Sequence, residues 1–232
     1  MIKIENVDVY GWESAIRGMR NPMNSWDKSD SHFDYKNPWS WEHPKNLIPV
    51  CIGENDLARM KKLVKAGTDH RKFMRMINVA ADITAPLYWW KEFDTYKVGT
   101  VRNSCSTIHK KEFTLDDFSH EHLACDWKSG AHCKLECVGE WSMEMYPEPL
   151  LKLIVCVLNS NRNMYLQTQD EKYWWQIIQL LPSSYNQRAT VQLNYEVLLN
   201  MYHSRKTHKL DEWRTFYEWI EKLPYMEEFL KV

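Results

Sequence analysis

The sequence lacks any segment that would span or enter a membrane. It has no run of about 18 apolar residues, and its N-terminal MIKIENVDVYGW lacks the basic and apolar regions of a signal peptide. We therefore expect a cytoplasmic protein with no membrane partner.

A basic excess is also absent. The 30 Lys and Arg residues are balanced by 31 Asp and Glu residues, which gives a formal net charge of -1. Proteins that bind nucleic acid generally carry a basic excess or a basic stripe. The composition therefore argues against a nucleic-acid partner, and any anion that the chain binds is expected to be small.

Glycine is scarce, with only 7 residues, and no glycine-rich phosphate loop occurs. The Rossmann and P-loop nucleotide folds both require such a loop, because backbone N–H groups must approach the phosphates closely. Both classes are excluded, so a nucleotide would have to be recognised by side chains.

The 6 cysteines do not resemble a disulfide framework in a chain of 232 residues, and we expect reduced thiols. Cys105 lies near Lys97 and Arg102 and could act as a nucleophile, but no base is placed for it, so we predict no catalytic residue. A structural zinc site is a second alternative, although neither Cys-x-x-Cys nor His-x-x-x-His occurs, and we predict no metal. Its candidate ligands are His120, His122, Cys125, His132, Cys133 and Cys137.

Hydrophobic residues make up 44% and charged residues 26% of the chain, which is typical of a soluble globular protein. No repeat or linker is evident, so we expect one α+β domain over residues 1–232. The 12 Trp and 12 Tyr residues suit either ordinary packing or interfaces and base-stacking pockets.

Local patterns predict the elements of this domain. The N-terminal strand should end at Gly11, and the segment 21–46 should be a long ordered loop. A helix should have Asn55 or Asp56 as its N-cap and end before Gly67. The remaining expectations are a strand at 77–84, a helix beginning at Pro86, irregular structure at 111–140, and helices from Glu148, at 171–181, at 184–203 and at 210–222.

The predicted helix over 184–203 carries Val191, Asn194, Leu198 and Met201 on one face. Asn194 should then be partly buried, and its amide needs a partner in backbone, water or ligand. With Arg188 near one end and Arg205 at the other, this helix could grip a phosphate with two guanidinium forks. The alternative is that both arginines are solvated surface residues.

The C-terminal segment LPSSYNQRATVQLNYEVLLNMYHSRK resembles the final helical section of flavin-dependent thymidylate synthases. The family pattern of Leu-Pro, Arg, two Asn and a closing Arg is matched without a gap, and a strand that ends in Ala-Pro before the signature loop also fits. The resemblance covers residues 55–110 and 180–230. The matching positions are Ala85, Pro86, Leu181, Pro182, Arg188, Asn194, Asn200 and Arg205.

The resemblance implies a small antiparallel sheet with helices, a helical C-terminal half, and a homotetramer that binds flavin adenine dinucleotide (FAD) and deoxyuridine monophosphate (dUMP). Methylenetetrahydrofolate would donate the carbon and NADPH the hydride. The implied nucleotide-binding residues are Arg188, Arg205, Glu92, Asn103, Cys105 and Thr107. The implied cofactor-binding residues are Thr95, Tyr96, Lys97, Asn194, Asn200 and His208.

The signature loop departs from the family pattern. Thr95, Tyr96 and Lys97 stand where the family has Arg-His-Arg, and Glu196 replaces a helix arginine of the flavin site. We therefore hold two hypotheses, the reductive methylation of dUMP and a non-catalytic relative that binds or sequesters a nucleotide without flavin chemistry. A third alternative is a structural protein whose arginines only cap helices.

Overall fold

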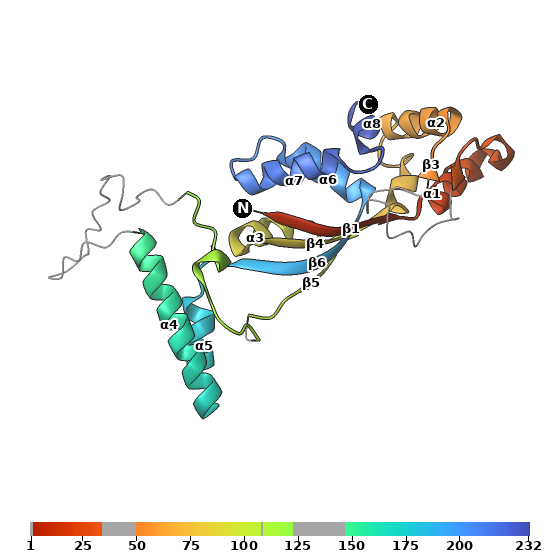
Figure 1. The fold of residues 1–232 in the computed structure, drawn as a ribbon. Helices are drawn as coiled ribbons and strands as arrows, with labels where there is room; N and C mark the ends of the chain where they lie inside the picture. Colours follow the sequence, from red (N-terminus) through yellow and green to blue (C-terminus); the bar gives the residue numbers. More distant parts are fainter. Residues whose placement is uncertain (1, 34–49, 108, 123–146) are drawn as a thin grey trace, which may run out of the picture. The chain divides into compact units, whose positions relative to one another are not determined.

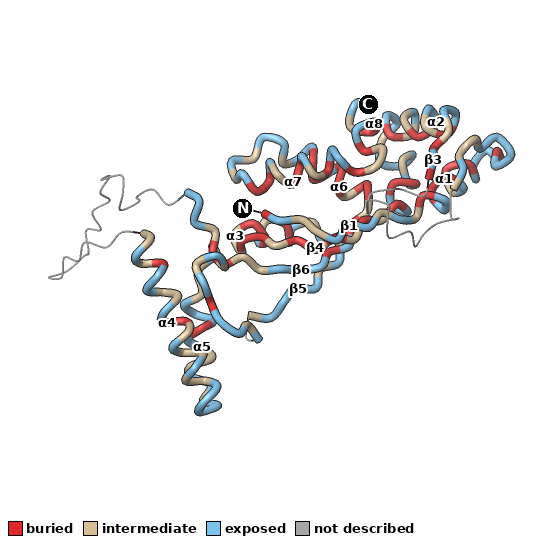
Figure 2. The backbone as a smooth tube through the Cα atoms, in the orientation of Figure 1, coloured by how far each residue is buried: buried red, intermediate tan, exposed pale blue. Residues whose placement is uncertain are grey.

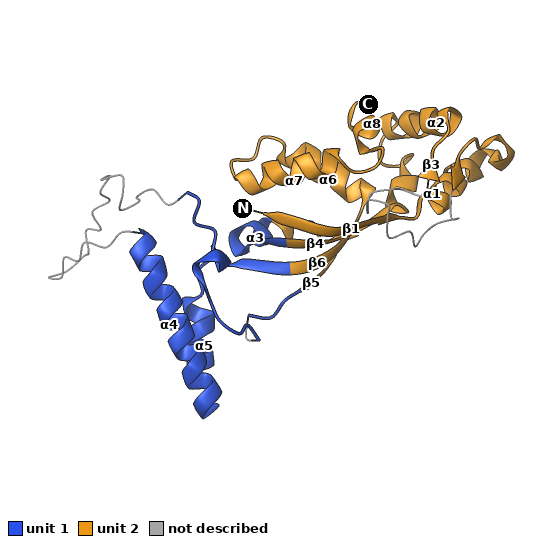
Figure 3. Cartoon of the chain, viewed as in Figure 1, with its two compact units in different colours: residues 1, 84–92, 104–188 blue, residues 2–83, 93–103, 189–232 orange. Residues whose placement is uncertain are grey.

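The computed structural model describes residues 2–33, 50–107, 109–122 and 147–232. These residues form two compact units (Figure 3). Unit 1 contains residues 84–92 and the described part of 104–188, and unit 2 contains the described part of 2–83 together with 93–103 and 189–232. A single domain over residues 1–232 stays a prediction.

The predicted fold class is confirmed, because the chain is α+β with a small antiparallel sheet and several helices (Figure 1). The helices are α1 (Trp12–Arg20), α2 (Glu54–Lys65), α3 (Leu87–Phe93), α4 (Pro147–Thr168), α5 (Glu171–Leu180), α6 (Tyr195–Arg205), α7 (Asp211–Glu221) and α8 (Met226–Leu230). The strands are β1 (Lys3–Tyr10), β2 (His32–Phe33), β3 (Val50–Cys51), β4 (Asn78–Pro86), β5 (Val101–Ser104) and β6 (Asn186–Asn194). Short 3-10 helices are η1 (Asn21–Met23), η2 (Trp26–Lys28), η3 (Lys72–Arg75) and η4 (Leu115–Asp117).

The main sheet has four strands in the order β1-β4-β6-β5. Burial alternates along its central strands, as expected where one face of a sheet is packed and the other is open. In β6, for example, Ala189, Val191 and Leu193 are buried while Thr190 and Gln192 are exposed (Figure 2). Figure 1 shows α6 and α7 on one side of the sheet, and their buried side chains complete the core of unit 2.

The prediction of one helix over 184–203 is wrong. Residues Asn186–Asn194 form strand β6, and helix α6 begins only at Tyr195. The alternation of buried and exposed residues, with β-branched Thr190 and Val191 in the middle, favours a strand over a helix. Arg188 therefore lies on a strand and Arg205 at the end of a helix, so no single helix carries both.

Several other expected elements are confirmed within about two residues, which is the usual uncertainty of element ends. They are the N-terminal strand, the strand after residue 77, and the helices near 148, 171–181 and 210–222. The helix expected at Pro86 begins one residue later, because β4 continues through Pro86. Of the expected loop 21–46, residues 21–33 are described and contain η1, η2 and β2. Residues 34–46, and 123–140 of the irregular segment, lie outside the described residues.

Helix α2 begins at Glu54, and its N-terminus is capped from elsewhere in the chain. The Asp30 carboxylate accepts hydrogen bonds from the backbone N–H groups of Asn55 at 2.8 Å and Asp56 at 3.0 Å. These two amides are among those that a helix start leaves without an intrahelical partner. The hydrogen bonds from these backbone N–H groups, chiefly the one from Asn55, lower the pKa of the Asp30 carboxyl. The sequence alone indicated Asn55 or Asp56 as the cap, which is wrong because the cap comes from a distant loop.

A buried ion pair fixes the same loop to α2. Arg20 Nε donates to Asp56 Oδ1 at 2.7 Å, and the two side chains are 4% and 0% exposed. The second carboxylate oxygen of Asp56 accepts from the hydroxyls of Ser29 at 2.6 Å and Ser31 at 2.7 Å. Because each oxygen of the buried carboxylate is satisfied, the pair can hold the described part of the 21–33 segment in place.

Unit 1 has a core of its own. Phe113, Phe118 and Tyr185 pack edge to face or tilted, with ring centroids 5.7 to 6.5 Å apart. Leu151 and Leu158 of α4 and Ile177 of α5 complete this cluster. The segment before η4 is tied to α4 by Asn159, whose amide bonds both backbone groups of Phe113 at 2.8 Å. None of the described helices is both long and apolar enough to cross a bilayer.

The substitution Asp56→Asn should lower the free energy of unfolding by about 3–5 kcal/mol, because it leaves the Arg20 guanidinium buried without its counter-charge. Urea denaturation followed by circular dichroism measures this change. A matched control is Lys152→Ala, which removes an exposed pair with Glu148 and should cost about 0–1 kcal/mol. Equal costs for the two substitutions would contradict a structural role for the buried pair.

Candidate functional site

The predicted signature loop lies between α3 and β5, and its residues 93–103 belong to unit 2. Thr95, Lys97 and Asn103 are exposed along it. The Nη1 atom of Arg102 donates to Asp94 Oδ2 at 2.5 Å, an ion pair that joins the two ends of the loop. The Arg102 guanidinium is therefore used to hold the loop together.

The tip of this loop lies against the start of α6. Gly99 has φ +74°, and a Cβ added there would lie 2.6 Å from Asn194 Nδ2 and 3.3 Å from a methyl group of Val197. The Asn194 amide is fixed in turn, because its Oδ1 accepts the backbone N–H of Val197 at 3.0 Å and so caps α6. Asn194 is thus a helix cap in contact with the loop. The prediction that it lies within the apolar face of a helix is wrong.

The other end of α6 meets the same loop. Arg205 Nε donates to the Tyr96 hydroxyl at 3.0 Å, and the guanidinium carbon lies 5.6 Å from the Tyr96 ring and 5.2 Å from the Trp213 ring. The His208 ring lies 6.1 Å from Trp213, and its Nδ1 accepts the backbone N–H of Leu210 at 3.2 Å. Three predicted site residues, Tyr96, Arg205 and His208, are therefore brought together around Trp213.

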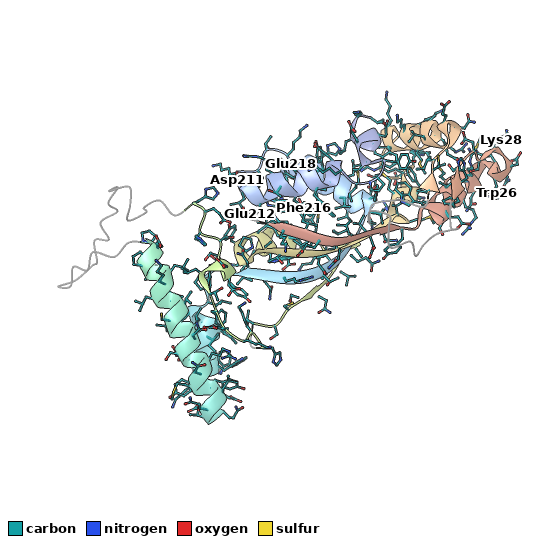
Figure 4. The ribbon with its side chains drawn as sticks, viewed as in Figure 1. Trp26, Lys28, Asp211, Glu212, Phe216 and Glu218 are labelled. Carbon is teal, nitrogen blue, oxygen red and sulfur yellow. The ribbon has the colours of Figure 1, made fainter. Side chains whose placement is uncertain are left out.

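The Trp213 ring is fully buried, and it also packs edge to face on Phe216 of α7. Phe216, which is labelled in Figure 4, packs in turn on Phe93 at the end of α3. The platform beneath Arg205 is thus part of the core of unit 2. Sequence reasoning did not single out Trp213, because a Trp on a helix is most often a core residue.

Arg71 is the functional candidate that sequence reasoning missed. Its Nε donates to Glu196 Oε1 at 3.1 Å, while Glu196 Oε2 lies 2.9 Å from the same nitrogen without hydrogen-bond geometry. Arg71 Nη2 reaches Asn200 Oδ1 at 3.2 Å and Thr68 Oγ1 at 3.4 Å. The carboxylate that departs from the family pattern is therefore neutralised. No local signal could have found this pair, because its members are 125 residues apart.

In unit 1, Arg188 and Cys105 lie on neighbouring backbone segments. The Cys105 N–H donates to the Arg188 carbonyl at 2.8 Å, and Gln187 Nε2 donates to the Cys105 carbonyl at 2.9 Å. The Arg188 side chain and the Cys105 thiol are both exposed. Glu92 and Thr107 are half-buried in the same unit.

Among the residues that the structure describes, no group of three or more His, Cys, Asp or Glu side chains could hold a metal ion. Four of the six candidate zinc ligands, Cys125, His132, Cys133 and Cys137, lie outside that set. A zinc site therefore stays an alternative that rests on the sequence alone.

Gly99→Ala should destabilise the protein more than Gly67→Ala. Both glycines have positive φ, +74° and +97°, but a Cβ at Gly67 meets nothing within 4 Å. The backbone strain of about 1–2 kcal/mol is common to both variants. The contact with Asn194 should add about 1–3 kcal/mol at Gly99 alone. Urea denaturation measures both costs, and equal values would show that the loop does not rest on Asn194.

Comparison with known proteins gives a structural likeness only. No family model matches the sequence, and no curated protein matches it. The chain is similar to thymidylate synthase X (ThyX) from Helicobacter pylori, solved with FAD and dUMP, with a TM-score of 0.60 and 14% identity over 99% of this chain and 97% of that one. It is also similar to the UMP/dUMP methylase PolB from Streptomyces cacaoi, solved with 5-Br UMP, with a TM-score of 0.57 and 12% identity over 100% and 94%. These similarities define a ThyX-like fold.

Proposed function

We propose that this chain binds a uracil nucleoside monophosphate. The observation that carries the proposal is the ThyX-like fold over almost the whole chain, combined with the ligand that the similar structures share. ThyX was solved with dUMP and PolB with 5-Br UMP or 5-Br dUMP, whereas FAD is named only for ThyX. Fold similarity alone does not establish function, so the proposal also needs residues of this chain that suit the ligand.

Arg205 suits the phosphate of such a nucleotide. Its bond to Tyr96 and its contacts with the Tyr96 and Trp213 rings fix the plane of the guanidinium. A guanidinium that is already ordered loses less conformational entropy when it binds a phosphate. Arg188, exposed on β6 beside Cys105 in unit 1, is the other arginine that the sequence pattern assigns to the nucleotide. The other nucleotide contacts that we propose are those predicted from the sequence, namely Glu92, Asn103, Cys105 and Thr107.

Arg188→Ala and Arg205→Ala should each weaken dUMP binding by about tenfold to a hundredfold. A charge-assisted hydrogen bond contributes about 1.5–3 kcal/mol, and about 1.4 kcal/mol corresponds to a factor of ten. Isothermal titration calorimetry with dUMP, and with dAMP for base preference, measures the change. Arg205→Lys keeps the charge but loses the planar fork, so it should recover only part of the affinity.

The control for these variants is Arg17→Ala, an arginine that is 63% exposed on α1. It should leave dUMP affinity unchanged. Retention of full dUMP affinity by the Arg188→Ala, Arg205→Ala double variant would rule out the proposed phosphate site.

A second candidate function is the reductive methylation of dUMP with methylenetetrahydrofolate, NADPH and FAD. It is favoured by the structural similarity to a thymidylate synthase and to a UMP/dUMP methylase over 94% or more of their length. If the chain has this function, we expect it to be a homotetrameric, cytoplasmic enzyme.

An assay that contains all three reagents and excess FAD separates the two candidates. Methylation predicts a 5-methyl product that depends on Arg188 and Arg205. Binding alone predicts that dUMP is recovered unchanged from protein that calorimetry shows to be saturated. We expect the second result, because Asn194 and Asn200 are already hydrogen-bonded within unit 2.

A further inference from the structure

Four of the six side chains predicted to hold FAD are already bonded to their own unit. Asn194 accepts from Val197, Asn200 from Arg71, and Tyr96 from Arg205, at 3.0, 3.2 and 3.0 Å. His208 Nδ1 accepts from the backbone at 3.2 Å. Each of these bonds would have to be broken or shared for the same atom to serve a ligand, so they compete with flavin binding.

The loop and the start of α6 also leave no gap between them at Gly99. Gly99 and Asn194 are in direct contact, so that even one added carbon atom at Gly99 would lie 2.6 Å from the amide nitrogen. A flat ring system inserted between two surfaces requires a separation of about 7 Å, twice the contact distance of about 3.5 Å. The loop and the helix would therefore have to separate before a ring could enter.

The charges in the first turns of α6 disfavour a diphosphate. Glu196 is 5% exposed, and its carboxylate is paired with Arg71. The Arg71 guanidinium is held by Glu196, Asn200 and Thr68, so this pair adds no net positive charge to the helix. The exposed ammonium of Lys97 remains on the loop, and lysine acts as a point charge without the fork that grips two phosphate oxygens.

We propose that α6 is covered by this chain's own side chains, so that the chain binds a nucleoside monophosphate and excludes FAD. The residues present do not fit the dinucleotide that accompanies dUMP in ThyX. The inference rests on the proposed uracil-nucleotide site, and it names Gly99, Asn194, Arg71 and Glu196 as the residues that set this selectivity.

The test titrates the full-length protein separately with dUMP, FAD and flavin mononucleotide by calorimetry, and follows the flavins by their fluorescence. We expect saturable dUMP binding and no saturable flavin binding at concentrations tenfold above the dUMP dissociation constant. Flavin binding with a dissociation constant within tenfold of that for dUMP would overturn the inference while leaving the proposed function intact. If neither dUMP nor a flavin binds, both the proposed function and the inference fail.

Two substitutions test the residues named. Glu196→Gln keeps an acceptor for Arg71 but removes the carboxylate, and Asn194→Ala removes the group in contact with Gly99. We expect the double variant to gain at least tenfold in FAD affinity relative to its own dUMP affinity. The control Glu221→Gln, on α7, should gain none. A double variant with native circular dichroism and no gain would show that these contacts do not exclude flavin, and an unfolded one leaves the wild-type titration to decide.

Discussion

The hydrogen bond from the Val197 N–H to the Asn194 side chain is the constraint on which the arrangement of unit 2 depends. It ends strand β6 and starts helix α6 at one residue. The next backbone N–H, that of Tyr195, donates to the Ile77 carbonyl at 3.0 Å and ties the joint to the residue before β4. Because the amide of Asn194 also supports Gly99, the strand, the helix and the signature loop share one fixed point.

The same principle governs the charged groups of unit 2. Asp56 and Glu196 are buried carboxylates, and each has an arginine from a distant segment beside it. A buried charge without a partner is costly, so once such an arginine is present it is committed to the carboxylate. An arginine close to a predicted site is therefore available to a ligand only if no buried acid already holds it. Arg71 is held in this way by Glu196. The Arg205 guanidinium also contacts its own unit, at the Tyr96 hydroxyl and at the rings of Tyr96 and Trp213.

The sequence was informative where one period dominated and ambiguous where two overlapped. Alternation over 77–84 indicated β4, and apolar spacing indicated most of the helices. Over 184–203, Val191, Asn194, Leu198 and Met201 fit a helical face, while Ala189, Val191 and Leu193 fit a strand. Asn194 followed by Glu196 is a helix-start signal. This signal predicts a helix that begins after Asn194, with a strand before it. The partners of Glu196 and Asp56 could not be predicted, because contacts across a whole chain leave no local pattern.

The distinction between fold and site follows from these observations. Packing of the sheet against α6 and α7 requires apolar residues at alternate strand positions and on helix faces, and many sequences supply them. Binding a particular cofactor requires in addition that specific polar atoms stay unengaged and that a gap stays open. In this chain Asn194 and Asn200, which match the family pattern, and Tyr96, which departs from it, all bond to partners within unit 2. A chain can therefore keep the fold at 14% identity while its polar side chains at these positions bond within the protein itself.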